Sequence, residues 1–225
     1  MQFTHNNMPD PVAFKHLLLS RKTTKARFRL PLSYEQTVTY LTAAVEAEVE
    51  YRHQAFVASD ALTQHIATAA HWLGGKGKFG LMLMGRPGNG KTTLMRAIAS
   101  LINAFDMLRD DYGDPMGVRT MAATELARLN RDDYHAFRKV CFTPMLALDD
   151  LGQEPNEIKD YGNIVTPAVD LLCQRYNDQL FTLVTTNLAK RGAGSLREYY
   201  GDRIADRFNE MMDFIVFDEP SYRGR

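Results

Sequence analysis

The sequence predicts an α/β fold in which helices flank a mainly parallel β-sheet. From Gly80 onward, apolar runs of strand length alternate with segments of helix length, and a glycine-rich turn joins the first strand to the first helix of this series. Strands separated by helical crossovers pair in parallel and are covered on both faces. The 225 residues, 45% hydrophobic and 24% charged, also have the ordinary composition of a folded chain.

The first 54 residues are expected to be mainly helical and basic. Ser33 and Gln36 form a capping box for a helix over 34–54, and a second helix begins after Ser59 or Asp60 and ends at Gly74. The segment from Pro11 to Tyr34 contains no acidic residue, and its basic residues are Lys15, Arg21, Lys22, Lys25, Arg27 and Arg29. This segment is either an arm that binds DNA or a partner, or a charged flexible extension.

The remaining elements alternate along the chain. The expected strands are 80–84, 117–122, 145–148, 181–187 and 214–217. The expected helices are 91–104, 123–130, 164–178 and 196–211.

The strongest motif is Gly85 to Thr92, GRPGNGKT, which fits GxxxxGK[ST] between an expected strand and an expected helix. Such a P-loop turns backbone N–H groups toward phosphate oxygens at a helix N-terminus. Lys91 is expected to reach the β- and γ-phosphates of ATP, and Thr92 to bind Mg²⁺. The expected nucleotide-binding residues are Gly85, Arg86, Pro87, Gly88, Asn89, Gly90, Lys91, Thr92 and Thr93.

Polar residues at two later strand ends complete the expected site. In MLALDD, Asp149 is placed to support Mg²⁺ and Asp150 to orient or deprotonate an attacking water. Asn187 ends the strand LVTTN and is placed to position that water. Further along the chain, Arg203, Arg207 and Arg223 are candidates for stabilising phosphate charge, because guanidinium is planar and permanently charged.

The ordered set GRPGNGKTT, LALDDLG, TTN, YGDRIADRF and SYRGR resembles AAA+ ATPases of the DnaC/IstB-like family, which are bacterial helicase loaders and transposition accessory ATPases. The resemblance covers residues 55–225, expected to be the AAA+ ATPase domain, with 1–54 as an N-terminal extension for partner docking. It implies that Asn187 is sensor 1, Arg207 the arginine finger and Arg223 the sensor 2 arginine. The C-terminal lid is abbreviated, and Asp150 stands where many AAA+ proteins have Glu, which implies slow hydrolysis.

The resemblance further implies a homo-oligomer in the ATP state, because an arginine finger acts on a neighbouring subunit's nucleotide. It implies binding to DNA, preferably single-stranded, and a replicative helicase or a transposase as partner. The chain is formally neutral, with 27 Lys and Arg against 27 Asp and Glu. Any basic DNA-binding surface must therefore be confined to one part of the protein surface. The candidates for it are Arg119, Arg128, Arg131, Arg138 and Lys139, with Tyr134 and Phe137 for base stacking.

Composition and competing motifs narrow the function. Two cysteines without a CxxC pair argue against a disulfide scaffold or a cysteine zinc site, and no apolar run spans a bilayer, so we expect a cytoplasmic protein without membrane contact. A helicase loader acting in DNA replication is the first expectation. The alternatives are an ATPase assisting a transposase, a nucleotide-gated DNA-binding switch with little turnover and, least favoured, a small-molecule kinase.

Overall fold

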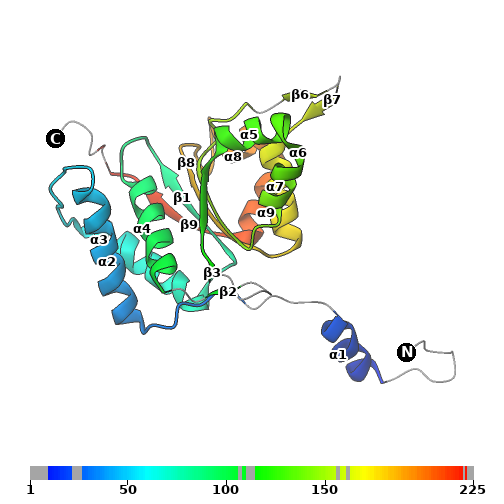
Figure 1. Cartoon of the computed structure of the whole chain (residues 1–225), viewed down its shortest axis with the longest axis horizontal. Coiled ribbons are helices and arrows are strands. Elements are labelled where there is room, and N and C mark those ends of the chain that lie inside the picture. Colours follow the sequence, from blue (N-terminus) through cyan, green and yellow to red (C-terminus); the bar gives the residue numbers. More distant parts are fainter. Residues whose placement is uncertain are drawn as a thin grey trace.

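The computed structural model describes residues 10–21, 27–105, 108–109, 115–155, 158–160, 163–219 and 221. Its centre is a five-stranded sheet with the order β4-β5-β8-β1-β9, in which every neighbouring pair is parallel (Figure 1). This confirms the expected fold class. The strands are β1 (Gly80–Gly85), β4 (Arg119–Ala122), β5 (Met145–Leu151), β8 (Phe181–Thr186) and β9 (Met212–Phe217).

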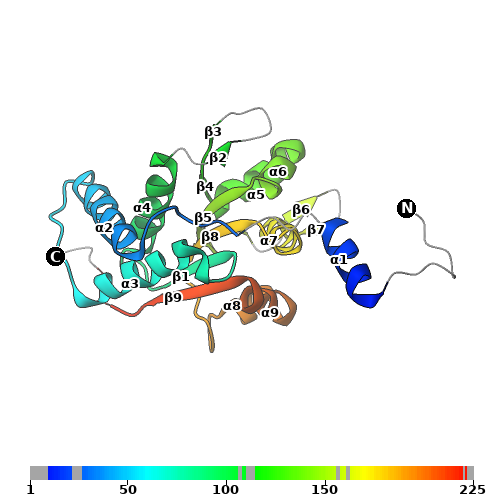
Figure 2. The ribbon, with the colours of Figure 1, turned by 90° about the horizontal axis from the view of Figure 1, so that it is seen from below.

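Alternation along the strands divides the core into two layers. In β1, Leu81 and Leu83 point to one face of the sheet, and Met82 and Met84 point to the other. All four side chains are buried, as a sheet covered on both faces requires. Figure 2 shows the helices on the two sides of the sheet.

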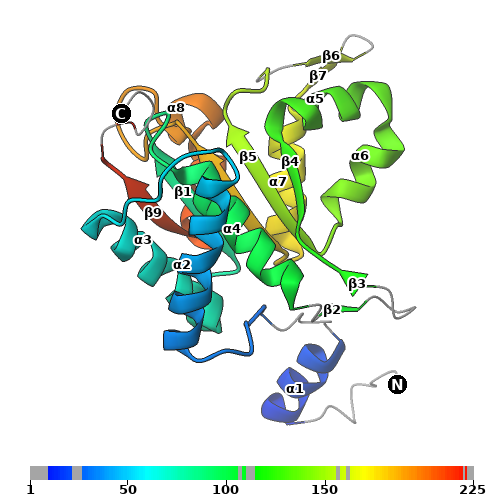
Figure 3. The same ribbon diagram turned by 60° about the vertical axis from the view of Figure 1, so that its left-hand side comes forward.

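Three helices cover the first face: α2 (Tyr34–Glu50), α3 (Asp60–His71) and α4 (Lys91–Ala104). The predicted capping box holds, because the Ser33 side chain accepts from the Gln36 backbone while the Gln36 side chain accepts from the Ser33 N–H. Leu41 and Val45 of α2 are buried in the same core as α4, and Figure 3 shows the two helices side by side. Although α2 precedes the predicted domain boundary at residue 54, it therefore packs on the helix that follows the P-loop.

The opposite face is covered by α5 (Ala123–Asp132), α6 (Tyr134–Cys141), α7 (Pro167–Asn177), α8 (Leu196–Tyr200) and α9 (Asp202–Met211). The single helix predicted over 196–211 is wrong in one respect, since Gly201 has φ +82° and separates α8 from α9. Helix α6 was not predicted, and the helix predicted over 164–178 begins only at Pro167, after Thr166.

Smaller elements lie outside the central sheet. A five-residue π-helical turn (Trp72–Lys76) follows α3, and two antiparallel pairs join β2 (Leu108–Arg109) to β3 (Pro115–Met116) and β6 (Ile158–Asp160) to β7 (Asn163–Val165). Helix α1 (Pro11–Arg21) stands apart from the sheet in Figures 1 to 3. Among the helices of the described ranges, none combines the length and the hydrophobicity that a membrane span requires.

Candidate functional site

The P-loop occupies the turn from β1 into α4, at the carboxyl end of the sheet. Gly85 has φ +144°, and a Cβ there would lie 2.2 Å from the carbonyl oxygen of Phe217, so the loop requires glycine. Gly90 caps α4 with a left-handed backbone, φ +94°. The loop is thus pressed against the end of β9 and leads directly into the positive end of α4.

Polar contacts hold the loop from inside. The Lys91 ammonium donates to the carbonyls of Gly85 and Arg86, both at 2.8 Å, and to Oδ1 of Asn89 at 3.1 Å. The amide of Asn89 donates in turn to the Phe217 carbonyl at 2.8 Å. Both Lys91 and Asn89 are buried, whereas Arg86 is exposed. The lysine is therefore held on the inner side of the loop that the motif assigns to phosphate.

Asp149 links the P-loop helix to the two central strands. It belongs to β5, and its Oδ1 accepts from the Thr92 hydroxyl at 2.9 Å and from the Thr185 hydroxyl at 2.6 Å. Thr185 is fully buried in β8, which lies between β1 and β5 in the sheet. The sequence pattern brings Thr92 and Asp149 together as expected, but it does not single out Thr185, although this residue stands in the TTN segment.

Asp150 is exposed and has a left-handed backbone, φ +57°. The pairing of β5 with β8 is irregular between Leu148 and Leu151, and the Asp150 N–H donates to the Thr185 hydroxyl at 2.8 Å. Asp tolerates this conformation better than most residues. The irregularity places the two neighbouring aspartates in different surroundings, with Asp149 half-buried and Asp150 open to solvent.

Asn187 directly follows β8, at the same edge of the sheet. Its Oδ1 is buried and has no hydrogen-bond partner among the residues that the structure describes. A buried amide oxygen without a partner costs about 1–3 kcal/mol. Such an atom at a strand end beside Asp149 and the P-loop suits a bound polar group, which supports the position predicted for it.

The three candidate arginines differ in their surroundings. Arg203 is exposed in the first turn of α9. Arg207, one turn later, is half-buried, donates to Sγ of Cys173 and lies with its Cζ 5.2 Å from the centroid of the Tyr176 ring. These contacts hold Arg207 against α7 of its own chain. Arg223 lies outside the described residues.

Two further residues make contacts near these elements, although no local sequence motif predicts them. Arg52, in the turn after α2, donates from Nη1 to the hydroxyl of Thr93 at 3.1 Å. Glu154, in the loop after β5, is buried and accepts from the Tyr200 hydroxyl and from the Gly152 N–H. The only local signal for Glu154 is an acid shortly after a strand-end Asp pair. No local sequence signal points to Arg52, because its partner Thr93 is 41 positions away in the chain.

Only some of the side chains expected to bind DNA are exposed and unpaired among the described residues. Tyr134 is 61% exposed, but Phe137 is 1% exposed in the core, so the prediction that Phe137 stacks on a base is wrong. Arg131 is paired with the neighbouring Asp132 at 2.7 Å, and Arg138 lies over the Phe142 ring. The amphipathic period of α6 turns Phe137 inward, which the local charge pattern did not indicate.

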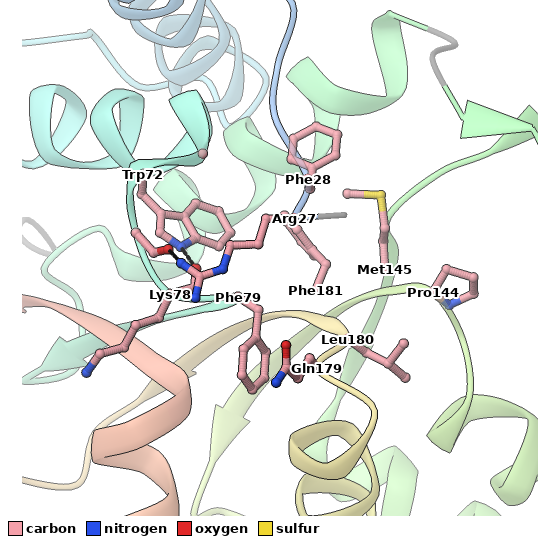
Figure 4. Close-up of a pocket in the computed structure, with 12 residues that line it drawn as sticks. Arg27, Phe28, Trp72, Lys78, Phe79, Pro144, Met145, Gln179, Leu180 and Phe181 are labelled. Carbon is pink, nitrogen blue, oxygen red and sulfur yellow. Dashed lines mark hydrogen bonds between the residues drawn. The ribbon is translucent and has the colours of Figure 1, made fainter. Parts of the chain in front are cut away.

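Two hollows lie elsewhere on the chain. One, of about 200 Å³, is lined by the aromatic side chains of Phe28, Trp72, Phe79 and Phe181 at the amino ends of the strands (Figure 4). The other, of about 330 Å³, is lined by the cations Lys190, Arg191 and Arg197 among others. Arg197 is paired with Asp202 and Asp206, which reduces the positive charge there. The first hollow lies at the opposite edge of the sheet from the P-loop.

The donors at the P-loop fit magnesium. Mg²⁺ prefers oxygen ligands and in nucleotide sites is held by one or two protein side chains together with phosphates. The Thr92 hydroxyl and the Asp149 carboxylate are 2.9 Å apart and supply such oxygens. The described residues contain no group of three or more His, Cys, Asp and Glu side chains that would form an all-protein metal site.

Comparisons with known proteins give a shared fold. No family model and no curated protein matches the sequence. The crystal structure of the DnaC helicase loader matches with a TM-score of 0.56 and 20% identity, covering 80% of this chain and 99% of that one. The crystal structure of DnaI matches with a TM-score of 0.53 and 21% identity, covering 78% and 93%.

A third structure, AMPPCP-bound DnaA from Aquifex aeolicus, matches with a TM-score of 0.51 and 17% identity. It covers 72% of this chain but 48% of the DnaA chain, so the likeness extends over about half of DnaA. Together with the parallel sheet order and the P-loop between β1 and α4, these matches identify the architecture. The chain has the P-loop AAA+ fold found in DnaC-like structures.

Proposed function

We propose that the chain is an ATP-hydrolysing AAA+ protein that assembles on single-stranded DNA and acts as a DnaC-like helicase loader. The observation that carries the ATPase part is the pair of hydrogen bonds from Thr92 and Thr185 to one oxygen of Asp149. They tie the first turn of the P-loop helix to the strand end that supplies the carboxylates. This contact brings together the hydroxyl and the carboxylate that P-loop ATPases use to hold Mg²⁺.

Each side chain has a chemical role in the proposal. Lys91 neutralises the β- and γ-phosphates, and Thr92 with Asp149 would hold Mg²⁺, which neutralises charge on the phosphate oxygens when bound. Asp150 orients or deprotonates the attacking water, and Asn187 positions that water through its amide. Arg207 is proposed to stabilise the γ-phosphate of a neighbouring subunit, and Arg223 to contact the nucleotide of its own subunit.

Assembly and DNA binding rest on similarity. A further structure with a related fold is the replication initiator DnaA bound to AMPPCP and single-stranded DNA, which matches with a TM-score of 0.51 and 14% identity and covers 73% of this chain and 49% of the DnaA chain. On this chain, the exposed cations Arg119 and Lys139 and the exposed ring of Tyr134 remain available for DNA. We propose a homo-oligomer in the ATP state with a replicative helicase as partner. If a transposase is captured instead, the IstB-like alternative holds.

A second function, a nucleotide-gated DNA-binding switch with little turnover, is favoured by Asp150. Its carboxylate is about one methylene shorter than that of glutamate, and its side chain is exposed. A base that is both short and open to water orients an attacking water less tightly than a longer one held in a dry site. In this case ATP binding would control assembly, and hydrolysis would serve only to reset it.

The test is the ATPase rate per subunit against protein concentration, with and without single-stranded DNA. A rate that rises with concentration, at a threshold lowered by DNA, supports the assembling ATPase. ATP binding with negligible turnover under all conditions supports the switch. Lys91→Ala is the control for both, because it removes the cation that the loop holds for phosphate. Failure of the wild-type chain to bind ATP would contradict the proposed function altogether.

A further inference from the structure

The turn after α2 brings an arginine to the entrance of the P-loop helix. Arg52 donates from Nη1 to the hydroxyl of Thr93, the third residue of α4, at 3.1 Å. The turn is built by hydrogen bonds from the Arg52 N–H to the Val49 carbonyl and from the His53 N–H to the Glu50 carbonyl. The backbone of Arg52 therefore belongs to a hydrogen-bonded turn, and its guanidinium lies next to the residue that follows Thr92.

Packing fixes where this turn lies. Leu41 and Val45 of α2 are buried in the core that also contains Leu94 and Ile98 of α4. The two helices run antiparallel, since Arg52 meets Thr93 at one end and the Tyr40 ring meets the Phe105 ring at the other, with centroids 6.2 Å apart. The packing of α2 on α4 therefore keeps the backbone of this turn beside the P-loop helix, while the Arg52 side chain itself is exposed.

The electrostatic environment at this position favours an anion. The first turn of α4 contains no acidic residue, and its free N–H groups give it a positive partial charge. Lys91 adds a full positive charge two residues before Thr93. Arg52 makes no ion pair with any residue in the described part of the chain. Arg52 is exposed, so water screens its repulsion from Lys91 in the free chain, whereas an anion bound at this position would be attracted by both cations.

We propose that Arg52 binds the α-phosphate of the nucleotide in the P-loop and so extends the nucleotide site into the segment that precedes it. This inference rests on the proposed function. Lys91 and Thr92 serve the β- and γ-phosphates and the metal, so a cation anchored beyond them on Thr93 faces the α-phosphate side. ATP and ADP both carry that phosphate, and Arg52 contributes to the binding of each.

The test measures the dissociation constants of ATP and ADP for the wild-type chain and for variants. Arg52→Ala is expected to weaken both nucleotides by about tenfold, the effect of one lost charge-assisted hydrogen bond. Arg52→Lys keeps the charge but loses the planar fork and is expected to recover only part of the affinity. Arg96→Ala removes an exposed arginine from α4 one turn further on and is the matched control, with wild-type affinity expected.

The outcomes separate this inference from the function on which it rests. If the wild-type chain binds ATP, Lys91→Ala does not, and Arg52→Ala binds both nucleotides normally, the role of Arg52 is wrong and the P-loop assignment stands. If Arg52→Ala weakens ATP but leaves ADP unchanged, the arginine contacts the γ-phosphate and the α-phosphate assignment is wrong. If the wild-type chain binds neither nucleotide, the proposed function itself fails.

Discussion

The Thr185 hydroxyl donates to Oδ1 of Asp149 at 2.6 Å and accepts from the Asp150 N–H at 2.8 Å. One buried side chain of the central strand β8 therefore orients the carboxylate of Asp149 and the backbone of Asp150 at the end of β5. Thr92 meets the same Asp149 oxygen from the P-loop helix. Changes in β8 can thus reach the residues proposed to hold the metal and to activate water.

Thr185→Val removes both hydrogen bonds while keeping the side-chain shape. We expect the rate of ATP hydrolysis to fall by about tenfold, since a hydrogen bond to a charged group contributes roughly 1.5–3 kcal/mol. ATP affinity should change little because Lys91 is untouched. Steady-state kinetics together with a binding titration measure the two effects separately.

Thr186→Val is the matched control for this experiment. The Thr186 hydroxyl donates to the Leu151 carbonyl at 2.6 Å and accepts from the Leu188 N–H, and it contacts neither aspartate. A loss of turnover in Thr186→Val equal to that in Thr185→Val would mean that the effect comes from the loosened strand, not from the orientation of Asp149 and Asp150.

Asp150→Glu tests whether side-chain length limits hydrolysis. The added methylene extends the carboxylate toward the water proposed to attack the γ-phosphate, so turnover is expected to rise. Stability is expected to fall by about 1 kcal/mol, because Glu tolerates the left-handed backbone at φ +57° less well than Asp. Single-turnover hydrolysis and thermal unfolding measure the two changes.

Asp150→Asn is the comparison variant, since asparagine accepts the left-handed conformation but cannot take a proton. It should bind ATP and remain assembled while hydrolysing more slowly than the wild-type chain. If Asp150→Asn hydrolyses ATP at the wild-type rate, Asp150 is not the group that activates water. The ATPase rate and size-exclusion chromatography in ATP give both results.

Sequence patterns predicted the features whose causes are local. The capping box at Ser33, the strand-turn-helix around Gly85 and the hydrophobic strand before Asp149 each depend on residues close together in the chain. The pairing of Thr92 with Asp149 followed because parallel strands bring their carboxyl ends to one edge. The fold class and the five strands of the central sheet could therefore be predicted from the sequence.

Features that depend on distant partners were not predicted. The contact between Arg52 and Thr93 exists only because α2 packs along α4. Phe137 has the spacing of a surface aromatic among cations, but the packing of α6 against α7 buries it. The break at Gly201 was missed because one glycine within a helical pattern is not by itself a stop signal.

A buried arginine outside the proposed site should contribute strongly to the stability of the packing at the amino ends of β5 and β8. Arg175 is fully buried in α7 and donates to the Thr182 hydroxyl and to the carbonyls of Cys141, Thr143 and Phe181. Burial lowers its pKa to about 9, so it remains charged at neutral pH. Arg175→Met would remove the donor from the three carbonyls, whereas the Thr182 hydroxyl would keep its bond to the Leu180 carbonyl.

We expect Arg175→Met to lower the free energy of unfolding by about 3 kcal/mol, from three carbonyls that lose their donor at roughly 1 kcal/mol each. Lys139→Ala, which removes an exposed cation from the neighbouring α6, should change it by less than about 0.5 kcal/mol. Urea unfolding followed by circular dichroism measures both. Equal stabilities for the two variants would contradict the structural role of Arg175.

The Tyr200 hydroxyl donates to the buried carboxylate of Glu154 and joins the loop after β5 to α8. Burial, with the nearby Glu154 charge, raises the pKa of Tyr200 above its ordinary value of 10. The folded state therefore favours the neutral phenol. This contribution to stability is fully present below pH 10 and is lost as the pH rises through the raised pKa of the folded state.

Tyr200→Phe should lower the free energy of unfolding by about 1–3 kcal/mol at pH 7, because one carboxylate oxygen is left unpaired. The difference between Tyr200→Phe and the wild-type chain should shrink above pH 10, since only the wild-type chain loses the phenol's contribution there. Tyr199→Phe removes a bond to the Glu154 carbonyl instead and should cost less. A difference that stays constant from pH 7 to pH 11 would contradict this account.

The proposed arginine finger gives the last prediction. Arg207→Ala should leave ATP binding by the monomer intact while removing the rise of ATPase rate with concentration, because the finger acts across a subunit boundary. It should also lower stability slightly, since Arg207 packs over the Tyr176 ring and contacts Cys173.

Arg203→Ala is the matched control, because Arg203 is exposed one turn earlier on α9. It should retain the concentration dependence of the ATPase rate. Mixing the Arg207→Ala chain with Lys91→Ala chains is the decisive measurement, since a Lys91→Ala subunit still offers its finger to a neighbour whose P-loop is intact. Recovery of activity in the mixture is expected. If Arg203→Ala abolishes the concentration dependence and Arg207→Ala preserves it, the finger is Arg203, and Arg207 serves only to pack α9 against α7.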